Sequence, residues 1–250
     1  MKIAGYSRKT SSYVPLYTKL LENFSLSSIM YSLLCEPVDC NIFFCSYDDY
    51  TMETKYKNAW IIFISGEPKP VPRIHFIIDC KQKETRFHPL NAGFFYFPFY
   101  TLSFIERKKN IPEHLIKSSL NDIHSLIHTK TRFCAYMYRY NIPHRVQLYE
   151  LLNSYKKIDA LGKSKNLNPF YKMDGDPYDD AVEKYKHYKF VLCVENRSIP
   201  GYITEKIINA MLAKAIPIYW GAPDVVQHFN PHSFICVSSF LNRNKLLEFI

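Results

Sequence analysis

Glycine is scarce in this 250-residue chain, and its cysteines do not come in pairs. Seven glycines and a hydrophobic fraction of 47% argue against disorder and against flexible low-complexity linkers. The seven cysteines are odd in number and include no C-x-x-C pair. Several lie in apolar runs, where free cysteine packs as a small hydrophobe. We therefore expect reduced thiols in a reducing compartment.

A membrane anchor is also missing from the pattern. The first ten residues, M-K-I-A-G-Y-S-R-K-T, contain no apolar core of the signal-peptide kind. The longest apolar run, residues 91–105, is broken by proline and is too short to span a bilayer as a helix. These absences predict a soluble, cytoplasmic protein.

Aromatic residues and positive charge are abundant. The 20 Tyr and 18 Phe provide stacking surfaces for sugars or bases. The 32 basic against 23 acidic residues give a formal charge of +9, which favours anionic partners. The basic residues form short scattered clusters, such as 81–86, 106–109 and 163–165, without a nucleic-acid motif. We interpret these clusters as solvated faces and predict no nucleic-acid partner.

Short apolar runs alternate with segments of helical spacing. Strand-like runs lie at 41–46, 60–65, 74–79, 132–137, 189–194 and 215–220, and helical spacing lies around 14–24, 111–128, 145–155, 178–187 and 203–213. Strands that are apolar on both faces and alternate with helices predict an α/β architecture with mainly parallel sheets.

A domain boundary is expected between residues 108 and 130. The segment 106–114 is polar and contains proline, and a new strand-like run follows it at 132–137. We therefore divide the chain into lobes 1–120 and 121–250. The two α/β lobes are expected to face each other across a cleft, with ligands at the carboxyl ends of the strands.

A polar loop, E-N-R-S-I-P-G-Y-I-T-E-K, joins two apolar elements of the second lobe at residues 195–206. It follows a predicted strand and begins a predicted helix, where backbone N–H groups and the helix dipole favour an anion. Lys206, in the first helical turn, opposes the dipole unless an anionic ligand is bound. The alternative is a solvent-exposed first turn in which Glu195, Asn196 and Tyr202 are structural.

Residues 188–235 as a whole resemble the signature of the α1,3-fucosyltransferase family. That signature runs F-x-L-x-F-E-N-S, Y-[IV]-T-E-K, [IV]-P-[IV]-x-x-G and N-P-x-S-F-[IV], and the order and spacing are kept here. Two further segments are similar to family motifs. F-I-S-G-E-P at 63–68 resembles a strand that ends in G-E-N, and H-R-V-Q-L-Y-E-L-L-N at 144–153 resembles an R-x-x-x-[FY]-x-x-L-N helix.

The resemblance implies a GT-B-like fold of two Rossmann-like lobes, the first binding the acceptor and the second binding GDP-fucose. It implies transfer of fucose from GDP-fucose to a glycan hydroxyl, with inversion. The expected acceptor is GlcNAc or Glc in a β-linked oligosaccharide, joined through an α1,3-type linkage.

The resemblance also implies the site residues. Glu67 is the expected general base, and Arg145 and Lys206 are expected to neutralise the departing diphosphate, helped by the hydroxyl of Tyr202. Glu205 is a candidate for ribose or fucose hydroxyls. Glu195 and Asn196 are expected to line the same donor-binding pocket.

No metal or other cofactor is expected beyond the donor substrate. The pair Asp174 and Asp176 forms a D-x-D, by which GT-A glycosyltransferases hold a divalent ion, and Asp48 and Asp49 form a second acidic pair. D-G-D-P is typical of a turn. Basic side chains replace the metal in the fold that the chain resembles.

Several departures from the family pattern keep other functions open. Val194 replaces an aromatic residue, Arg197 a small hydroxyl residue, and Pro68 the asparagine of G-E-N. The chain also ends fifteen residues after S-F-I, so the second lobe is expected to be minimal or cut short. One alternative is therefore a catalytically degenerate relative that binds a nucleotide sugar or a glycan. A third alternative is nucleic-acid binding driven by the positive charge, which predicts steep salt dependence and no preference for GDP.

Overall fold

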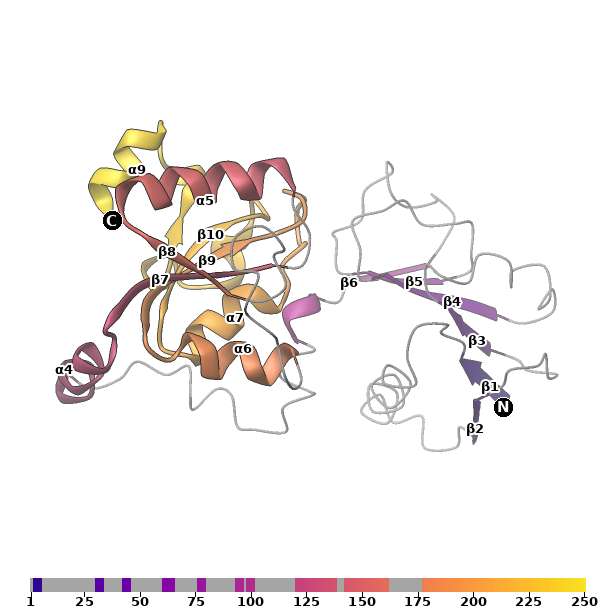
Figure 1. The fold of residues 1–250 in the computed structure, drawn as a ribbon. Helices are drawn as coiled ribbons and strands as arrows, with labels where there is room; N and C mark the ends of the chain where they lie inside the picture. The colour runs from indigo at the N-terminus through magenta and orange to yellow at the C-terminus, as the bar shows by residue number, and fades with distance from the viewer. Residues whose placement is uncertain are drawn as a thin grey trace. The chain divides into compact units, whose positions relative to one another are not determined.

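The chain forms two compact units, Met1–Pro98 and Phe99–Ile250. The computed structural model describes residues 2–5, 30–33, 42–45, 60–65, 76–79, 93–96, 98–101, 120–138, 142–161 and 177–250. Both units contain a sheet whose described strands are all parallel (Figure 1). The predicted α/β class with parallel sheets is therefore confirmed.

The sheet of the first unit has six strands in the order β2-β1-β3-β4-β5-β6. They are β1 Lys2–Gly5, β2 Met30–Leu33, β3 Ile42–Cys45, β4 Trp60–Ser65, β5 Phe76–Asp79 and β6 Gly93–Tyr96. Strands β3, β4 and β5 coincide with three predicted runs. The prediction missed β6, because its four residues are embedded in the longer apolar run 91–105. The helix predicted around 14–24 lies outside the described residues.

The sheet of the second unit has five strands in the order β11-β10-β9-β7-β8. They are β7 Arg132–Met137, β8 Ile158–Leu161, β9 Tyr188–Val194, β10 Ile216–Trp220 and β11 Ile235–Cys236. The α-helices are α4 Leu120–Thr129, α5 Pro143–Tyr155, α6 Pro177–Tyr185, α7 Glu205–Leu212, α8 Val225–His228 and α9 Arg243–Phe249. Three single-turn 3-10 helices complete this unit: η2 Phe99–Thr101, η3 Pro231–Ser233 and η4 Val237–Ser239.

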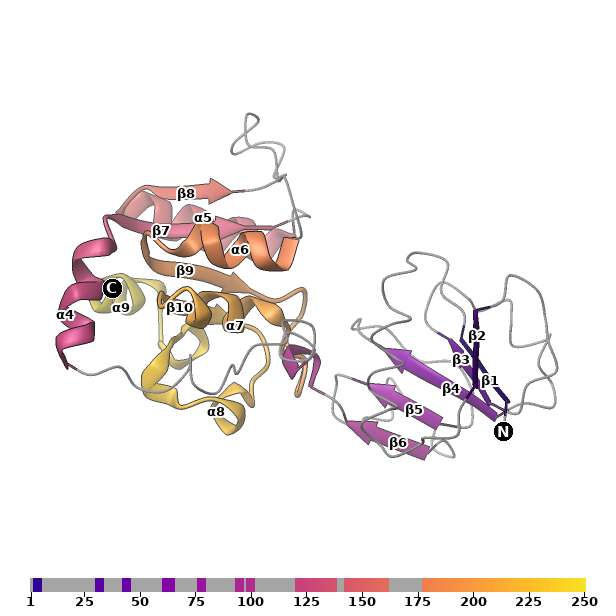
Figure 2. The ribbon, with the colours of Figure 1, turned by 90° about the horizontal axis from the view of Figure 1, so that it is seen from below.

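Helices cover both faces of the second sheet. Figures 1 and 2 show α5 and α9 on one face and α6 and α7 on the other. Alternate side chains of β9 point to opposite faces of the sheet. Val191 and Cys193 pack in the core under α6 and α7, whereas Leu192 and Val194 pack in the core under α5 and α9. This two-sided burial explains why β9 is continuously apolar in sequence.

The second unit begins earlier than the sequence predicted. The division lies between Pro98 and Phe99, not between residues 120 and 121. Tyr100 explains part of the difference, because its backbone N–H donates to the carbonyl oxygen of Ile203 at 3.1 Å. Its ring also packs against Phe229 with 4.9 Å between centroids. The polar segment 106–114, on which the predicted boundary rested, lies outside the described residues.

Of the helices that the structure describes, none combines the length and the apolarity needed to cross a bilayer. The expected cytoplasmic location stays a prediction. In the same part of the chain, Cys134, Cys193 and Cys236 are free thiols.

Candidate functional site

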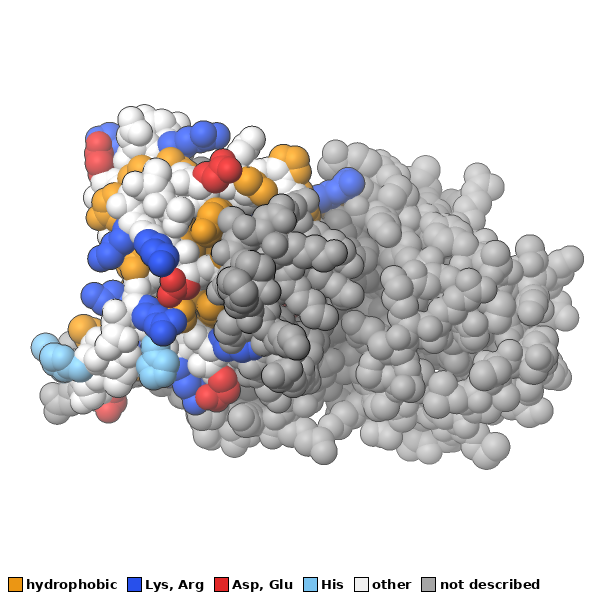
Figure 3. All heavy atoms as spheres, in the orientation of Figure 1, with side chains coloured by type: hydrophobic (Ala, Val, Ile, Leu, Met, Phe, Trp, Pro, Cys, Tyr) orange, Lys and Arg blue, Asp and Glu red, His pale blue; other side chains and the backbone are white. Residues whose placement is uncertain are grey.

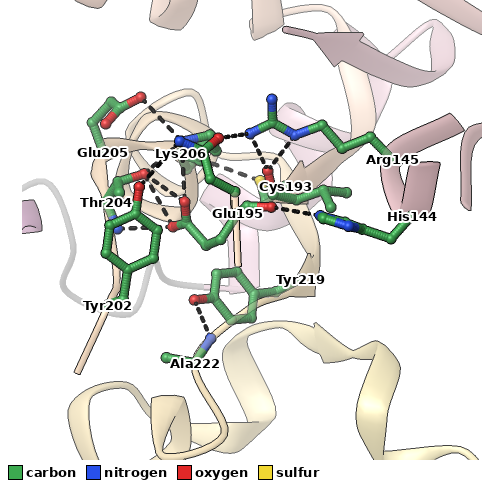
Figure 4. Close-up of polar contacts among 12 residues, drawn as sticks. His144, Arg145, Cys193, Glu195, Tyr202, Thr204, Glu205, Lys206, Tyr219 and Ala222 are labelled. Atoms are coloured by element: carbon green, nitrogen blue, oxygen red, sulfur yellow. Dashed lines mark hydrogen bonds and ion pairs between the residues drawn. The ribbon is translucent and has the colours of Figure 1, made fainter. Parts of the chain in front are cut away.

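The polar loop 195–204 connects the carboxyl end of β9 to the start of α7 (Figure 4). Helix α5 begins at the same edge of the sheet, with Pro143 in its first turn. Proline is favoured there because its missing N–H is not needed for the helix. Side chains from the two helix starts therefore meet over the end of one strand.

Glu195 is the first residue of this loop and directly follows β9. Its side chain is 0% exposed. Its Oε1 accepts the backbone N–H of Thr204 at 2.8 Å, and the Thr204 hydroxyl lies 2.8 Å from Oε2. The ammonium of Lys206 donates to the same Oε2 at 3.0 Å. A buried carboxylate is stable only when its oxygens are occupied in this way.

The backbone of Glu195 is held as firmly as its side chain. Its N–H donates to the carbonyl oxygen of Trp220 at 2.9 Å, which extends the pairing of β9 with β10. Its carbonyl oxygen lies 3.0 Å from Nε2 of His144. Because a carbonyl oxygen only accepts, Nε2 carries the proton in this contact. The His144 ring in turn lies on Trp220, with 4.2 Å between centroids.

Gly221 makes room for the Glu195 side chain. A Cβ at this position would lie 2.5 Å from Cγ of Glu195 and 2.5 Å from the hydroxyl oxygen of Tyr219. That Tyr219 hydroxyl accepts the backbone N–H of Ala222 at 3.1 Å and is fixed in place. Glycine is therefore the residue that fits the W-G-A-P turn.

Lys206 lies between two carboxylates. Its Nζ is 3.0 Å from Oε2 of Glu195 and 3.6 Å from Oε1 of Glu205, and it also donates to the Thr204 hydroxyl at 2.7 Å. Burial lowers the pKa of Lys206, but the two carboxylates outweigh burial, and the pKa lies above its ordinary value. From the sequence, a cation in the first turn of this helix was expected to need an anionic ligand. In the structure, the carboxylates of Glu195 and Glu205 lie beside this cation instead.

Arg145 reaches the same loop from α5 and is 3% exposed. Its Nε and Nη2 donate to the carbonyl oxygen of Val194 at 3.1 and 2.9 Å. Nη2 also donates to Oδ1 of Asn196 at 2.6 Å, and Nδ2 of Asn196 donates to the Tyr202 hydroxyl at 3.2 Å. Figure 4 shows Arg145 and Lys206 approaching the loop from two different helices. The Arg145 charge opposes the charged form of Lys206, as expected for neighbouring cations.

The structure thus brings six of the seven predicted site residues together, namely Arg145, Glu195, Asn196, Tyr202, Glu205 and Lys206. Glu195 differs from its expected position in one respect. Its side chain was expected to line a ligand pocket, but it has no exposed surface and contacts Thr204 and Lys206 instead.

The seventh residue, Glu67, lies outside the described residues. Strand β4 is described and ends at Ser65. The acidic pairs at 48–49 and 174–176 and the departure at Pro68 also lie outside the described part of the chain. Within that part, no group of three or more His, Cys, Asp or Glu side chains is placed to hold a metal ion.

The sequence did not predict the contacts that hold the loop in place from other parts of the chain. The carboxylate of Asp224 accepts the backbone N–H of Gly201 at 2.9 and 3.1 Å. Gly201 has φ of 77°, a conformation that glycine adopts without strain. The sequence P-G at 200–201 was the available signal, because this pair is typical of a turn with positive φ at its second central residue. The partner Asp224 in G-A-P-D carried no comparable signal.

Part of this chain is similar to known fucosyltransferases. Residues 127–250 match the family model described as glycosyltransferase family 10 (fucosyltransferase), C-terminal. A protein of Acanthamoeba polyphaga mimivirus named as a fucosyltransferase is 37% identical over 199 residues, which cover 77% of this chain and 31% of that protein. An α-(1,3)-fucosyltransferase of Helicobacter pylori is 39% identical over 110 residues, covering 44% of this chain and 22% of that protein. The chain thus spans less than a third of the length of either relative.

Solved structures show the same fold. A crystal structure of an α1,3-fucosyltransferase superimposes with a TM-score of 0.75 at 24% identity, covering 100% of this chain and 76% of that one. A crystal structure of an α1,3-fucosyltransferase with GDP-fucose gives a TM-score of 0.71, also at 24% identity and with the same coverage of both chains. At this identity the likeness establishes the fold, which is α/β of the GT-B type. The match to the family model, not the fold, relates residues 127–250 of this chain to the C-terminal domain of glycosyltransferase family 10, the fucosyltransferase family.

Proposed function

We propose that this chain transfers fucose from GDP-fucose to a hydroxyl group of a glycan acceptor. The observation that carries the proposal is the convergence of Arg145 and Lys206 at the carboxyl edge of a parallel sheet. Ligands of such sheets bind at that edge. Two fixed cations and the positive end of a helix dipole favour binding of an anionic group, and in the donor this group is the diphosphate. One similar protein was crystallised with GDP-fucose, which supports this choice of donor.

In this proposal Arg145 and Lys206 stabilise the charge that grows on GDP as it leaves. Arg145 is held in one geometry by the carbonyl oxygen of Val194 and by Asn196, so little side-chain entropy is lost on binding. Lys206 supplies a point charge, and its raised pKa keeps it protonated at neutral pH. Preorganised charges of this kind act mainly on the transition state. The site would therefore need no metal ion, and we propose no cofactor beyond the donor.

Glu195 is a positioning residue in this scheme. Its buried carboxylate and the Thr204 hydroxyl fix the ammonium of Lys206 before the donor arrives. Glu205 lies in the first turn of α7 and is partly exposed, so it is available to ribose or fucose hydroxyls. Tyr202 and Asn196 connect the loop to Arg145 and set its shape.

The acceptor half of the reaction is proposed from sequence resemblance. The acceptor hydroxyl oxygen attacks the anomeric carbon of fucose, its proton passes to the carboxylate of Glu67, and the bond between the anomeric carbon and the phosphate oxygen breaks. GDP leaves with the electron pair, and attack from the opposite face inverts the anomeric carbon. We propose GlcNAc or Glc of a β-linked oligosaccharide as the acceptor and an α1,3-type linkage.

The departures from the family pattern give little support to a degenerate relative. Val194 is 1% exposed and packs in the core under α5, and its carbonyl oxygen still receives Arg145. Arg197 is exposed. Neither side chain makes one of the contacts that join Arg145, Asn196, Glu195 and Lys206.

A transfer assay tests the proposal directly. The purified chain is incubated with GDP-fucose and N-acetyllactosamine, and both released GDP and the fucosylated product are measured. We expect equal amounts of the two in wild type, and in Glu67→Gln loss of product with GDP-fucose binding retained. Binding of GDP without any product from a panel of β-linked GlcNAc and Glc acceptors would favour the degenerate alternative. Absence of GDP binding in the folded protein would overturn the proposal.

A further inference from the structure

The amino-terminal edge of the second sheet carries a concentration of positive charge. Arg132 is the first residue of β7, Lys156 and Lys157 precede β8, Lys186 precedes β9, and Lys189 is its second residue. Parallel strands all begin at one edge, so cations that are scattered along the sequence meet there in space. We call these five residues the basic edge.

The basic edge is exposed and only partly neutralised by nearby acids. All five side chains belong to residues that are exposed to solvent. Arg132 lies 3.6 Å from Asp159, and Lys186 lies 2.6 Å from Glu183. Lys156, Lys157 and Lys189 form no ion pair with any residue in the described part of the chain. The Lys156 ammonium lies over the ring of Phe133, at 5.1 Å from its centroid.

Large apolar side chains are exposed beside these cations. Tyr155, the last residue of α5, is 53% exposed, and its ring contacts Phe133. Ile216, the first residue of β10, is 45% exposed. Ile127, near the end of α4, is 56% exposed, and its carbonyl oxygen receives the N–H of Lys130 just before β7. Figure 3 shows Lys and Arg side chains gathered with hydrophobic ones on the side of this unit where α4 leads into β7.

We propose that the basic edge is a docking surface for a membrane containing anionic phospholipids. Cations at a membrane surface are attracted by acidic headgroups, and apolar side chains among them insert at the level of the headgroups. This surface lies at the opposite edge of the sheet from Arg145 and Lys206. Docking therefore leaves the candidate site facing the aqueous phase. The inference rests on the charge and exposure of the edge and is independent of the proposed function.

The exposed apolar residues favour lipid over nucleic acid. The phosphates of a nucleic acid would bind the same cations, but phosphate contacts do not bury apolar side chains such as Ile127 and Ile216. Burial of these side chains in the headgroup region removes apolar surface from water, which is favourable. A membrane therefore accounts for both features of the surface.

Co-sedimentation with vesicles tests the proposal. The wild-type chain is expected to bind vesicles of phosphatidylcholine mixed with phosphatidylserine and to stay unbound with phosphatidylcholine alone. The double variant Lys156→Glu/Lys157→Glu is expected to lower the partition coefficient by about 30-fold or more, since each basic residue near an acidic surface contributes about a factor of five. The matched control is Arg243→Glu/Lys245→Glu on α9, which makes the same change in net charge at two residues that are not part of the basic edge. This control is expected to bind as wild type does.

Two further measurements distinguish the alternatives. Tyr155→Ser keeps the charge of the basic edge and is expected to weaken vesicle binding, because the side chain no longer inserts. Binding of a labelled mixed-sequence duplex DNA is measured for the same proteins. The proposal is overturned if folded wild type ignores the acidic vesicles, if both double variants lose binding equally, or if the basic edge binds DNA but not vesicles. Circular dichroism confirms that each variant is folded.

Discussion

The ammonium of Lys206 lies 3.0 Å from Oε2 of Glu195, a carboxylate with no exposed surface, while the Lys206 side chain itself is 22% exposed. The pair thus has a buried anionic end and a cationic end that reaches solvent. The carboxylate of Glu195 therefore holds Lys206 in position even when no anionic ligand is bound. Both the stability of the loop and its affinity for an anion are therefore predicted to depend on Glu195.

Glu195→Gln is predicted to destabilise the second unit. The change leaves the partly buried ammonium of Lys206 without its closest anion, and breaking a buried pair from one side costs about 3 kcal/mol. Glu205→Gln is the matched control, because Glu205 is partly exposed and lies 3.6 Å from the same ammonium. It is expected to cost less than about 1 kcal/mol. Urea denaturation of the two variants measures the difference, and equal losses would contradict the assignment of Glu195 as the main partner.

Gly221→Ala is predicted to disturb the same carboxylate from the other side. The new methyl group would lie 2.5 Å from both Glu195 and Tyr219, which requires one of them to move. Overpacking of this kind typically costs about 1–3 kcal/mol. Thermal denaturation and GDP titration are the measurements. A variant with wild-type stability and wild-type affinity would show that the turn tolerates a side chain.

Lys130→Met is predicted to destabilise the fold without affecting GDP binding. Lys130 is 6% exposed, and its ammonium donates to the carbonyl oxygens of Lys186 at 2.7 Å and Ala213 at 2.5 Å, at the ends of α6 and α7. Leaving these two acceptors unpaired costs about 1–3 kcal/mol. Lys130 lies at the amino edge of the sheet, away from Arg145. Weakened GDP binding in a stable Lys130→Met protein would contradict this separation.

The pH dependence of the same residue provides a second check. Burial lowers the pKa of Lys130 from 10.5 to about 8. The unfolded chain therefore binds more protons than the folded chain between these two pH values, and the free energy of unfolding rises with pH across that window. Wild type is expected to gain stability relative to Lys130→Met between pH 8 and 10.5. A constant difference between the two proteins would show that Lys130 titrates normally.

Tyr136→Phe is predicted to leave the fold as stable as before, or more stable by about 1 kcal/mol. Tyr136 is 1% exposed, and its ring packs against those of Tyr138 and Tyr149. Its hydroxyl has no hydrogen-bond partner among the residues that the structure describes. Removing a buried hydroxyl without a partner relieves its desolvation cost. Chemical denaturation measures the effect, with Tyr149→Phe as a control on the neighbouring ring. A loss of more than about 1 kcal/mol would mean that the hydroxyl is solvated or bonded in solution.

The extent of successful prediction differs between the two units. Strands β9 and β10 and helix α7 were predicted to within one or two residues at each end, because both faces of the strands are apolar and the helix has a clear apolar side. Strand β8 (I-D-A-L) was missed, because four residues that include the charged Asp159 show no clear alternation of apolar and polar side chains. In the first unit, β1 and β2 were also missed, because four residues are too few to show such a pattern.

The sequence grouped six residues that the structure brings together, but it did not give the contacts among them. Sequence resemblance placed Arg145 and Lys206 in one site, although 61 positions separate them along the chain. It gave no sign that Glu195 is buried, because a carboxylate in a polar loop is normally solvated. The burial follows from Thr204 and Gly221, whose contacts with Glu195 depend on how the loop folds back over β9. Such contacts between residues that are distant in sequence leave no local pattern.

Calorimetric titration of wild type and Lys206→Met with GDP and with guanosine tests the central claim most directly. If Lys206 binds the diphosphate, its loss removes a charge-assisted contact and lowers the affinity for GDP by about 10- to 100-fold. The affinity for guanosine, which has no phosphate, is expected to stay unchanged. An equal effect on the two ligands, or none on GDP, would contradict the account, because Lys206 would then not contact the diphosphate.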